Sequence, residues 1–525
     1  MAEGGPSGIP HVDSLGRGTV VMVVGTVLLF LLSFIGRVAV ARHLSVDAFG
    51  AFNLGLALAG LLSLVALLGL HQAVARTLAE NRDPAARRRV IRWAASITVV
   101  TSVLASALVF LLADPIADLF DPSGSSQLTV VFQMFSVTVG LTLLCTFISS
   151  VFQGFEDTVP NAWINQAVQP GAFVIFVYIF IAFHLNLYDA LLAWVLSNIV
   201  TFVVLLIYVW RRLPKHLPAG PVAKDLPGGM LVLSLSLWGV TTLAFVTAFV
   251  DTLILGVYRP ETDVGLYSAV MTLGRLLLAA SAAVTYIFLP VAARLTGQGD
   301  IQSIRTAYVT TARWVLLFTV PMFFVFGLLP GNSLDFVFGG AYTTGAFALE
   351  LVTFGALVSV AFGPVNVTLA GMGNVRPLLI ATVVSAVANV VLSFALIPTY
   401  GLIGAAIAWS VARVLYPATA ALSLYLKSQI TPLRRTLVLP LCVSLAVGVP
   451  LFLVVGIVPH SPWVVVPLYF AGVGIFLAAL LATRSLETGD LVICRILEGL
   501  VGRPLPGLER FMLRFSAPPT LTPPD

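Results

Sequence analysis

The chain has 525 residues, of which 59% are hydrophobic and 10% are charged, whereas a soluble domain carries roughly 25% charged residues. A mean hydropathy of +1.02 excludes a water-soluble fold of this length, because such a fold could not remove so much apolar surface from water. The net charge of +5 does not indicate a nucleic-acid partner, because the basic residues lie in short segments between long apolar runs.

About fourteen apolar stretches follow one another, each close to the roughly 20 residues that a helix needs to cross about 30 Å of hydrocarbon. They cover residues 18–40, 50–72, 92–113, 128–150, 162–183, 188–210, 230–256, 265–290, 307–329, 344–370, 377–397, 401–426, 437–458 and 462–483. Turn-forming segments such as Asp121-Pro122-Ser123-Gly124 separate them. The sequence therefore predicts an all-α integral membrane protein of about 14 transmembrane helices.

The N-terminus and the cysteines each suggest an alternative that we do not favour. Arg17 and the apolar run 19–35 resemble a signal peptide, but the run exceeds the usual length of roughly 7 to 15 residues. We expect this first helix to be retained. Cys145, Cys442 and Cys494 are scattered, which predicts neither a disulfide framework nor a zinc site. We expect no cofactor.

Basic residues predict the orientation, because short cytoplasmic loops are enriched in Lys and Arg. With a cytoplasmic N-terminus, most of the 28 basic residues fall in cytoplasmic segments, Arg305 and Arg313 among them. Arg42 and Arg259 are the exceptions in outer loops. The run Arg87–Arg89 most simply fixes this topology, with anionic membrane lipid as a secondary partner. We predict a multi-pass protein of the cell membrane with both termini in the cytoplasm.

A faint internal repeat predicts the architecture. Residues of the second stretch recur in the eighth, those after the fourth recur after the tenth, and those of the sixth recur in the twelfth, 215 or 217 residues later. The clearest pairs are Gly50 and Gly265, Phe52 and Tyr267, Gly154 and Gly371, Pro160 and Pro377, and Trp194 and Trp409. Two blocks of six helices with the same orientation are parallel repeats, as in some transporters, and rocking of two such lobes would give alternating access.

The predicted segments follow from this repeat. They are a cytoplasmic N-terminus at 1–17, an N-lobe at 18–213, a cytoplasmic linker at 214–229, a C-lobe at 230–428, two extra helices at 429–484 and a cytoplasmic tail at 485–525.

Several stretches carry a family resemblance. They are Phe34-Ile35-Gly36-Arg37, the segment 47–80, FQGFEDTVP (152–160), DTLILG (251–256) with DVGLYSA (263–269), and the segment 371–406. Their order and spacing resemble the polysaccharide-flippase branch of the multidrug/oligosaccharidyl-lipid/polysaccharide exporter superfamily. The resemblance implies two six-helix lobes around a central cavity and the flipping of a polyprenyl-phosphate-linked or polyprenyl-diphosphate-linked saccharide, supplied by glycosyltransferases of the same pathway. Such flippases often carry a basic residue where this chain has Met271 and Thr272, with Arg275 about one turn further on.

Five charged residues within predicted spans stand out: Arg37, Asp251, Arg275, Glu350 and Arg413. Each costs roughly 2.5 to 3.5 kcal/mol on insertion scales, which makes it a candidate functional residue. Guanidinium groups bind phosphate oxygens through paired, charge-assisted hydrogen bonds, so the three arginines are candidates for the phosphate or diphosphate. Arg37 and Asp251 occupy nearly equivalent places in the repeat and could face each other across the cavity.

Other roles for these charges remain open. Asp251 with Arg275, and Glu350 with Arg413, could be structural ion pairs, while Arg37 could extend its side chain to the interface. Asp251 and Glu350 could bind a coupling proton or sodium ion. His71, at the inner end of the second span, fits a packed or interfacial polar residue better than a proton relay. Polar side chains that could bind sugar hydroxyls, or that could join helices to one another, are Asn53, Gln153, Asn161, Asn165, Gln166 and Gln169.

Two other functions compete with flipping. A cation-coupled multidrug antiporter of the same superfamily would need acidic groups in the first lobe, whose spans carry Arg37 and no mid-span carboxylate. A membrane enzyme such as a glycosyltransferase would need an acidic catalytic or metal site on a sizeable loop, which the short loops do not offer. We therefore predict a transporter and not an enzyme.

Overall fold

The computed structural model describes residues 10–121, 127–218, 220–222 and 229–430, and then 442–443, 446–450, 453–454, 467, 470–476 and 478–479. Every regular element in these ranges is a helix, so the predicted all-α fold is confirmed. The predicted spans 437–458 and 462–483 lie largely outside the described residues, and the predicted tail 485–525 lies wholly outside them.

Ten helical segments in the described ranges are long and apolar enough to cross a membrane, which makes the chain a multi-pass membrane protein. They coincide with the first six predicted spans and with the ninth to the twelfth. The seventh and eighth predicted spans correspond to α9 (Met230–Tyr258) and α10 (Glu261–Gly297), helices of 29 and 37 residues.

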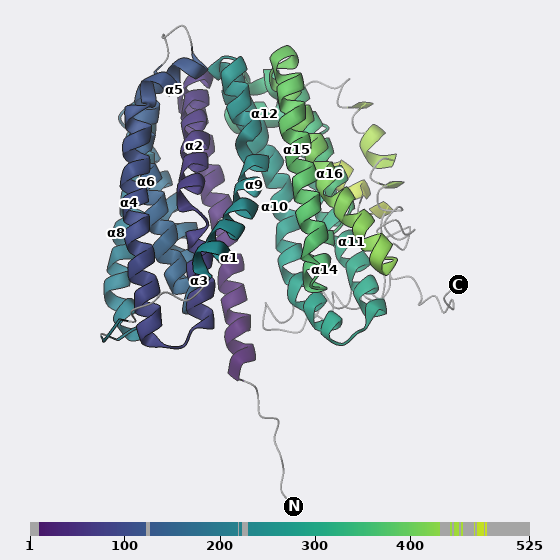
Figure 1. The fold of residues 1–525 in the computed structure, drawn as a ribbon. Helices are drawn as coiled ribbons and strands as arrows, with labels where there is room; N and C mark the ends of the chain where they lie inside the picture. The colour runs from purple at the N-terminus through teal and green to yellow at the C-terminus, as the bar shows by residue number, and fades with distance from the viewer. Residues whose placement is uncertain are drawn as a thin grey trace, which may run out of the picture. The chain divides into compact units, whose positions relative to one another are not determined.

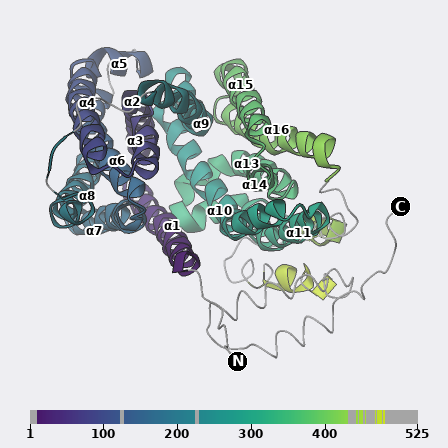
Figure 2. The same cartoon turned by 60° about the horizontal axis from the view of Figure 1, so that its bottom comes forward.

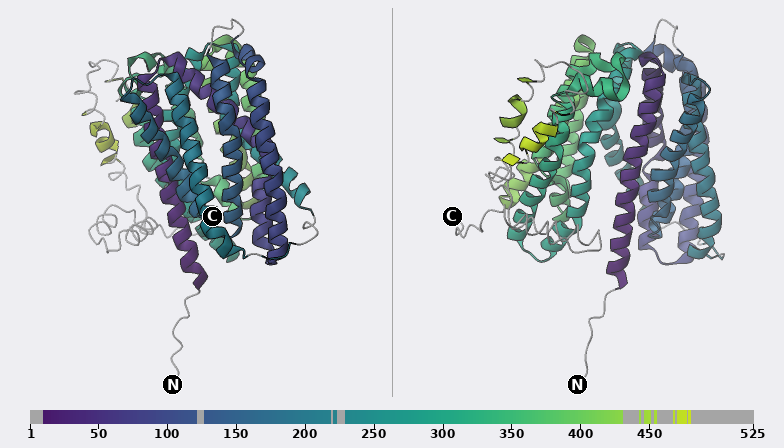
Figure 3. Two further views of the ribbon diagram at one scale, coloured as in Figure 1. Left: turned by 90° about the vertical axis from the view of Figure 1, so that its left-hand side faces the viewer. Right: turned by 180° about the vertical axis from the view of Figure 1, so that it is seen from behind.

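The helices form two compact units. Unit 1 comprises Met1–Ala269 and Ser393–Ala405, and unit 2 comprises Val270–Leu392 and Ala406–Asp525. Unit 1 holds α9, the start of α10 and the following helices: α1 (Pro10–His43), α2 (Val46–Leu67), α3 (Leu70–Glu80), α4 (Pro84–Leu111), α5 (Ala113–Phe120), α6 (Leu128–Gly154), η1 (Pro160–Val168), α7 (Gln169–Ile181) and α8 (Leu187–His216). Figure 1 shows α2, α4, α6 and α8 lying side by side, and Figure 3 shows α1 as one long helix.

Unit 2 contains the rest of α10 and the helices that follow it. They are α11 (Ile301–Phe326), α12 (Pro330–Phe338), η2 (Gly340–Gly345), α13 (Ala346–Ala361), α14 (Val365–Gly371), most of α15 (Val375–Tyr400) and most of α16 (Leu402–Ser428). Figure 2 shows α11, α13 and α14 next to one another. Two apolar clusters hold these helices together, one around Tyr308 and Leu369 and one around Leu316 and Phe324.

The second predicted span is interrupted between α2 and α3. Leu68 and Gly69 have φ angles of 49° and 67°, in the left-handed region that ends a helix. The freed carbonyl of Leu68 accepts a hydrogen bond from Ser234 Oγ of α9 at 2.6 Å. A Cβ atom at Gly69 would lie 2.2 Å from the carbonyl oxygen of Ser234, so only glycine allows α9 to approach this closely.

Two further predicted spans also depart from a regular α-helix. The fifth begins as the π-helix η1, whose next helix starts Gln169-Pro170, and Pro170 has no N–H to donate to a carbonyl in the preceding turn. The tenth is interrupted at Phe362-Gly363-Pro364, where Gly363 has a φ of 69°. There the hydroxyl of Tyr308 donates to the carbonyl oxygen of Phe362, which satisfies an acceptor that the interruption frees.

Each unit contains one of two equivalent close contacts from the repeat. In unit 1, a Cβ atom at Gly154 would lie 2.6 Å from Leu78 Cβ of α3. In unit 2, a Cβ atom at Gly371 would lie 3.0 Å from Ala292 Cβ of α10 and 3.2 Å from the backbone nitrogen of Ala293. Gly371 is the repeat counterpart of Gly154, and Ala293 is that of Leu78. The three-dimensional contacts therefore agree with the repeat that the sequence predicts.

Candidate substrate-binding residues within the membrane

Arg37 lies on α1 beside a polar residue of α2. Its Nη1 donates to Asn53 Oδ1 at 3.4 Å, and Asn53, which is 5% exposed, donates from Nδ2 to the carbonyl oxygen of Phe49 at 2.8 Å. The residue before it, Gly36, lets α1 pack closely against α7, since a Cβ atom at Gly36 would lie 2.8 Å from the ring of Phe173. Asn53, one of the polar candidates of the sequence, therefore joins α1 to α2 through the guanidinium of Arg37.

Asp251 is buried in α9, and each of its two carboxylate oxygens accepts a hydrogen bond. It is 1% exposed. The Tyr267 hydroxyl donates to its Oδ2 at 2.5 Å, and the backbone N–H of Thr252 donates to its Oδ1 at 2.8 Å. Tyr267 comes from α10 and is itself completely buried. Whether Asp251 faces Arg37, as the repeat suggests, stays a prediction.

Tyr267 and Thr252 were not among the candidate residues of the sequence analysis. Thr252 adjoins Asp251 in the chain, and Tyr267 is the aromatic residue of the DVGLYSA stretch, sixteen residues further on. A phenol in a buried helix needs a hydrogen-bond partner. The buried tyrosine therefore indicates that Tyr267 has a hydrogen-bond partner, but that this partner is Asp251 depends on how α9 and α10 pack.

Arg275, Glu350 and Arg413 belong to unit 2 and lie on α10, α13 and α16. The α13 and α16 helices touch closely, because Ser410 Oγ donates to the carbonyl oxygen of Leu351 at 3.0 Å. Arg413 follows Ser410 by about one turn, and its Nε is buried with no hydrogen-bond partner among the described residues. No ion pair joins Glu350 to Arg413, both of which the structure describes. The ion-pair interpretation of these two residues therefore finds no support.

Arg313 is a buried cation that the sequence analysis misplaced in a cytoplasmic segment. It lies inside α11, is 1% exposed, and is the largest fully buried side chain among the described residues. The α11 helix begins at Ile301, six residues before the predicted span, so Arg313 lies three turns inside the helix. A charged residue on the buried face of a spanning helix is a functional candidate by default.

Among the other polar candidates, one joins two helices and two have a buried atom without a hydrogen-bond partner among the described residues. Asn165 Nδ2 donates to Ser149 Oγ of α6 at 2.8 Å, which is the helix-joining use of a carboxamide. Gln166 Oε1 and His71 Nδ1 are buried and lack hydrogen-bond partners within the described part of the chain. Within the same residues, no group of His, Cys, Asp or Glu could hold a metal ion.

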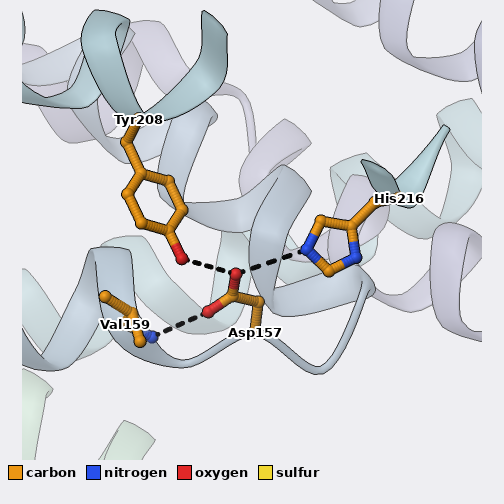
Figure 4. A network of polar contacts seen from close by, with 4 residues as sticks. All are labelled: Asp157, Val159, Tyr208 and His216. Atoms are coloured by element: carbon orange, nitrogen blue, oxygen red, sulfur yellow. Dashed lines mark hydrogen bonds and ion pairs between the residues drawn. The ribbon is translucent and has the colours of Figure 1, made fainter. Parts of the chain in front are cut away.

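Figure 4 shows a polar corner at the end of α8. Asp157, in the loop between α6 and η1, accepts hydrogen bonds from Tyr208 Oη at 2.7 Å and from the Val159 N–H at 3.1 Å. His216 Nε2 lies 3.4 Å from Asp157 Oδ2, and its ring stacks on Phe155 at 5.2 Å. The FQGFEDTVP stretch thus fixes the loop to the last turn of α8.

Solved structures with a similar fold define the class of protein. The lipid II flippase MurJ in an inward closed conformation matches with a TM-score of 0.67 and 14% identity, over 90% of this chain and 100% of that one. An inward-facing multidrug resistance MATE family transporter gives 0.63 and 15%, over 79% and 98%. A transporter of the same superfamily from Pyrococcus furiosus, described as having a binding pocket of reverse polarity, gives 0.55 and 15%, over 79% and 96%. The chain has the fold of the multidrug/oligosaccharidyl-lipid/polysaccharide exporter superfamily.

Family comparisons place the chain more narrowly. The family described as polysaccharide biosynthesis protein matches residues 15–296, and the MatE family matches residues 239–395. The chain belongs to the polysaccharide biosynthesis protein family. A curated relative, the probable low-salt glycan biosynthesis flippase Agl15 of Haloferax volcanii, is 22% identical over 161 residues, which are 31% of this chain and 34% of the relative. The match thus spans about a third of that relative's length.

Proposed function

We propose that this protein is a flippase that moves a polyprenyl-phosphate-linked or polyprenyl-diphosphate-linked oligosaccharide from the cytoplasmic to the outer leaflet by alternating access. The observation that carries the proposal is the excess of arginine over carboxylate within the spans. Asp251 already accepts hydrogen bonds from Tyr267 and Thr252. The buried Nε of Arg413, by contrast, has no hydrogen-bond acceptor among the described residues. Buried cations need anionic partners, and a phosphate headgroup supplies one.

The roles of the residues follow from their chemistry. Arg37, Arg275 and Arg413 bind phosphate oxygens, since a guanidinium keeps its charge and offers paired donors. Asn53 positions Arg37. Asp251 and Glu350 are the acidic candidates for the substrate, and either could take up a coupling proton or sodium ion. The names of two relatives, a lipid II flippase and a probable glycan biosynthesis flippase, support a lipid-linked saccharide as the substrate.

The setting of the proposed reaction is the cell membrane, with both termini in the cytoplasm. Glycosyltransferases of the same pathway supply the lipid-linked saccharide at the cytoplasmic face, and the protein itself performs transport and no covalent chemistry. Cysteines placed near Ser123 and Asn332 should then react with an impermeant thiol reagent in intact cells. A cysteine near Arg88 should not react, and its labelling would overturn the orientation.

A cation-coupled multidrug antiporter is the second candidate, because the MatE family matches residues 239–395. Deletion of the gene in its host separates the two candidates. Flipping predicts that lipid-linked saccharide accumulates on the cytoplasmic leaflet while its synthesis continues. Normal surface glycan, in a host without a second flippase, would remove the flippase proposal, and increased drug sensitivity alone would favour the antiporter.

A further inference from the structure

The first turns of α2 and α10 meet within unit 1 in a contact that is reciprocal under the internal repeat. A Cβ atom at Gly50 would lie 1.9 Å from the carbonyl oxygen of Glu261, and one at Gly265 would lie 2.1 Å from the carbonyl oxygen of Val46. Gly265 is the repeat counterpart of Gly50, and Glu261 is that of Val46, each 215 residues later. Each helix therefore places its glycine against the same position of the other.

A hydrogen bond between two further counterparts marks the centre of this α2–α10 contact. Thr262 Oγ1 donates to Asp47 Oδ1, and the two residues are 215 apart. The pseudo-two-fold axis of the repeat therefore passes between these side chains. Glycine on both helices allows their backbones to touch, so the contact depends on small residues at two related positions.

Carboxylates surround the α2–α10 contact. Glu261 is half-buried, and the carboxylates of Asp121, at the end of α5, and Asp47, on α2, act on it electrostatically. Burial raises the pKa of Glu261, and the negative charges of Asp121 and Asp47 raise it further. A hydrogen bond with its own backbone N–H lowers it. Burial raises the pKa of the neighbouring Asp263 as well, and the positive charge of Arg259 lowers it in part. The guanidinium of Arg259 donates to the carbonyl oxygens of Pro398 and Thr399 in the last turn of α15.

We propose that the α2–α10 contact is a pH-responsive closure, held shut when Glu261 is protonated and weakened when Glu261 is ionised. Two observations carry the proposal. The contact is close enough that both glycines are required, and it brings three acidic side chains from three elements to one place. Alternating access requires contacts of this kind to separate and re-form, and ionised carboxylates at such a contact repel one another.

The direction of the pH effect follows from linkage. Separation of the two helices would expose Glu261 to water and move it away from Asp47, so its pKa would fall toward the ordinary value. The closed contact therefore binds the proton more tightly. Closure is favoured at low pH and is lost as the pH rises through the raised pKa of the closed state. Each unit of difference in pKa changes the closed-to-open ratio by a factor of about ten.

Spin labels test this proposal without substrate, so that its failure would leave the proposed flippase function standing. His43 and Tyr258 are exposed residues near the contact, and His43→Cys with Tyr258→Cys, in a chain lacking Cys145, Cys442 and Cys494, gives two labelling sites. Electron paramagnetic resonance of the purified protein should show the short-distance population falling as the pH is raised from about 4 to about 8.

Three variants make the result decisive. Glu261→Gln should keep the short-distance population at every pH, and Asp121→Asn should shift the transition to lower pH because it removes a like charge. Asp118→Asn, at an exposed acid of α5, should leave the transition unchanged. A distance distribution that does not change with pH, or an unaltered transition in Glu261→Gln, would overturn the proposal. If Glu261→Gln does not fold, an unaltered transition in Asp121→Asn would overturn it.

Discussion

Two corners of the molecule occupy equivalent places in the repeat and yet are held together by different chemistry. The first follows α6, where Asp157 ties its loop to Tyr208 and His216 at the end of α8 (Figure 4). In the second, the counterpart of Asp157 is Asn374, which accepts a single exposed hydrogen bond from Lys427 Nζ at 3.2 Å. Both corners connect a loop to the last helix of the repeat. The backbone plan has therefore been kept while the polar groups have diverged.

A second pair of counterparts differs in the backbone itself. The second span is broken at Leu68-Gly69 and pressed against α9, whereas the equivalent part of α10 is one continuous helix of 37 residues. The broken helix frees carbonyl groups that a continuous helix would satisfy. In this pair of counterparts the first repeat contains the irregular backbone, and the second contains a continuous helix.

Gly69→Ala should have the largest effect on stability. It combines a left-handed φ of 67° with a Cβ position 2.2 Å from the Ser234 carbonyl oxygen, and we expect a loss of about 3 kcal/mol or more. Gly299→Ala is the matched control, because Gly299 has a φ of 70° with nothing within 4 Å, and it should cost only about 1 kcal/mol. Chemical denaturation in detergent measures both. Equal losses would show that contact with α9 does not matter.

The two equivalent glycines should respond unequally to alanine. The new Cβ would lie 2.6 Å from Leu78 Cβ in Gly154→Ala but 3.0 Å from Ala292 Cβ in Gly371→Ala. Overpacking costs about 1 to 3 kcal/mol, so we expect a value within that range for Gly154→Ala and a smaller one for Gly371→Ala. Melting temperatures of the two variants would reveal the order. A reversed order would contradict the geometry of the contacts.

The smallest effect on stability should come from the second polar corner. Asp157→Asn leaves Tyr208 and His216 with an amide in place of a carboxylate that is 14% exposed, and mismatched buried hydrogen bonds cost about 1 to 3 kcal/mol. Asn374→Ala removes one exposed hydrogen bond and should stay within about 0.5 kcal/mol. The same melting experiment compares them, and equal losses would mean that the corners are equivalent in energy as well as in position.

The positions of the spanning helices could be predicted from the sequence, because about 20 consecutive apolar residues have few alternatives in a membrane. The break at Leu68-Gly69 could not be predicted, since its stabilising partner Ser234 is 166 residues away and a glycine in an apolar run is ordinary in membrane helices. Arg313 was misplaced because it was counted with the cytoplasmic loop charges, although it lies inside the predicted span 307–329. Arg37 and Asp251 are candidates from charge alone, but their hydrogen-bond partners Asn53 and Tyr267 could be identified only from how the helices pack.

The most direct test of the central claim is the flipping of a polyprenyl-diphosphate-linked saccharide by purified protein in liposomes, with variants of Arg37. Arg37→Gln should reduce the rate at least about tenfold, because a charge-assisted pair is lost. Arg37→Lys should retain part of the rate, since the charge remains without the planar fork. Both proteins should be present at normal levels. Full-rate flipping by the double variant Arg37→Gln with Asp251→Asn would contradict the account, because no guanidinium would remain at that position to bind the phosphate.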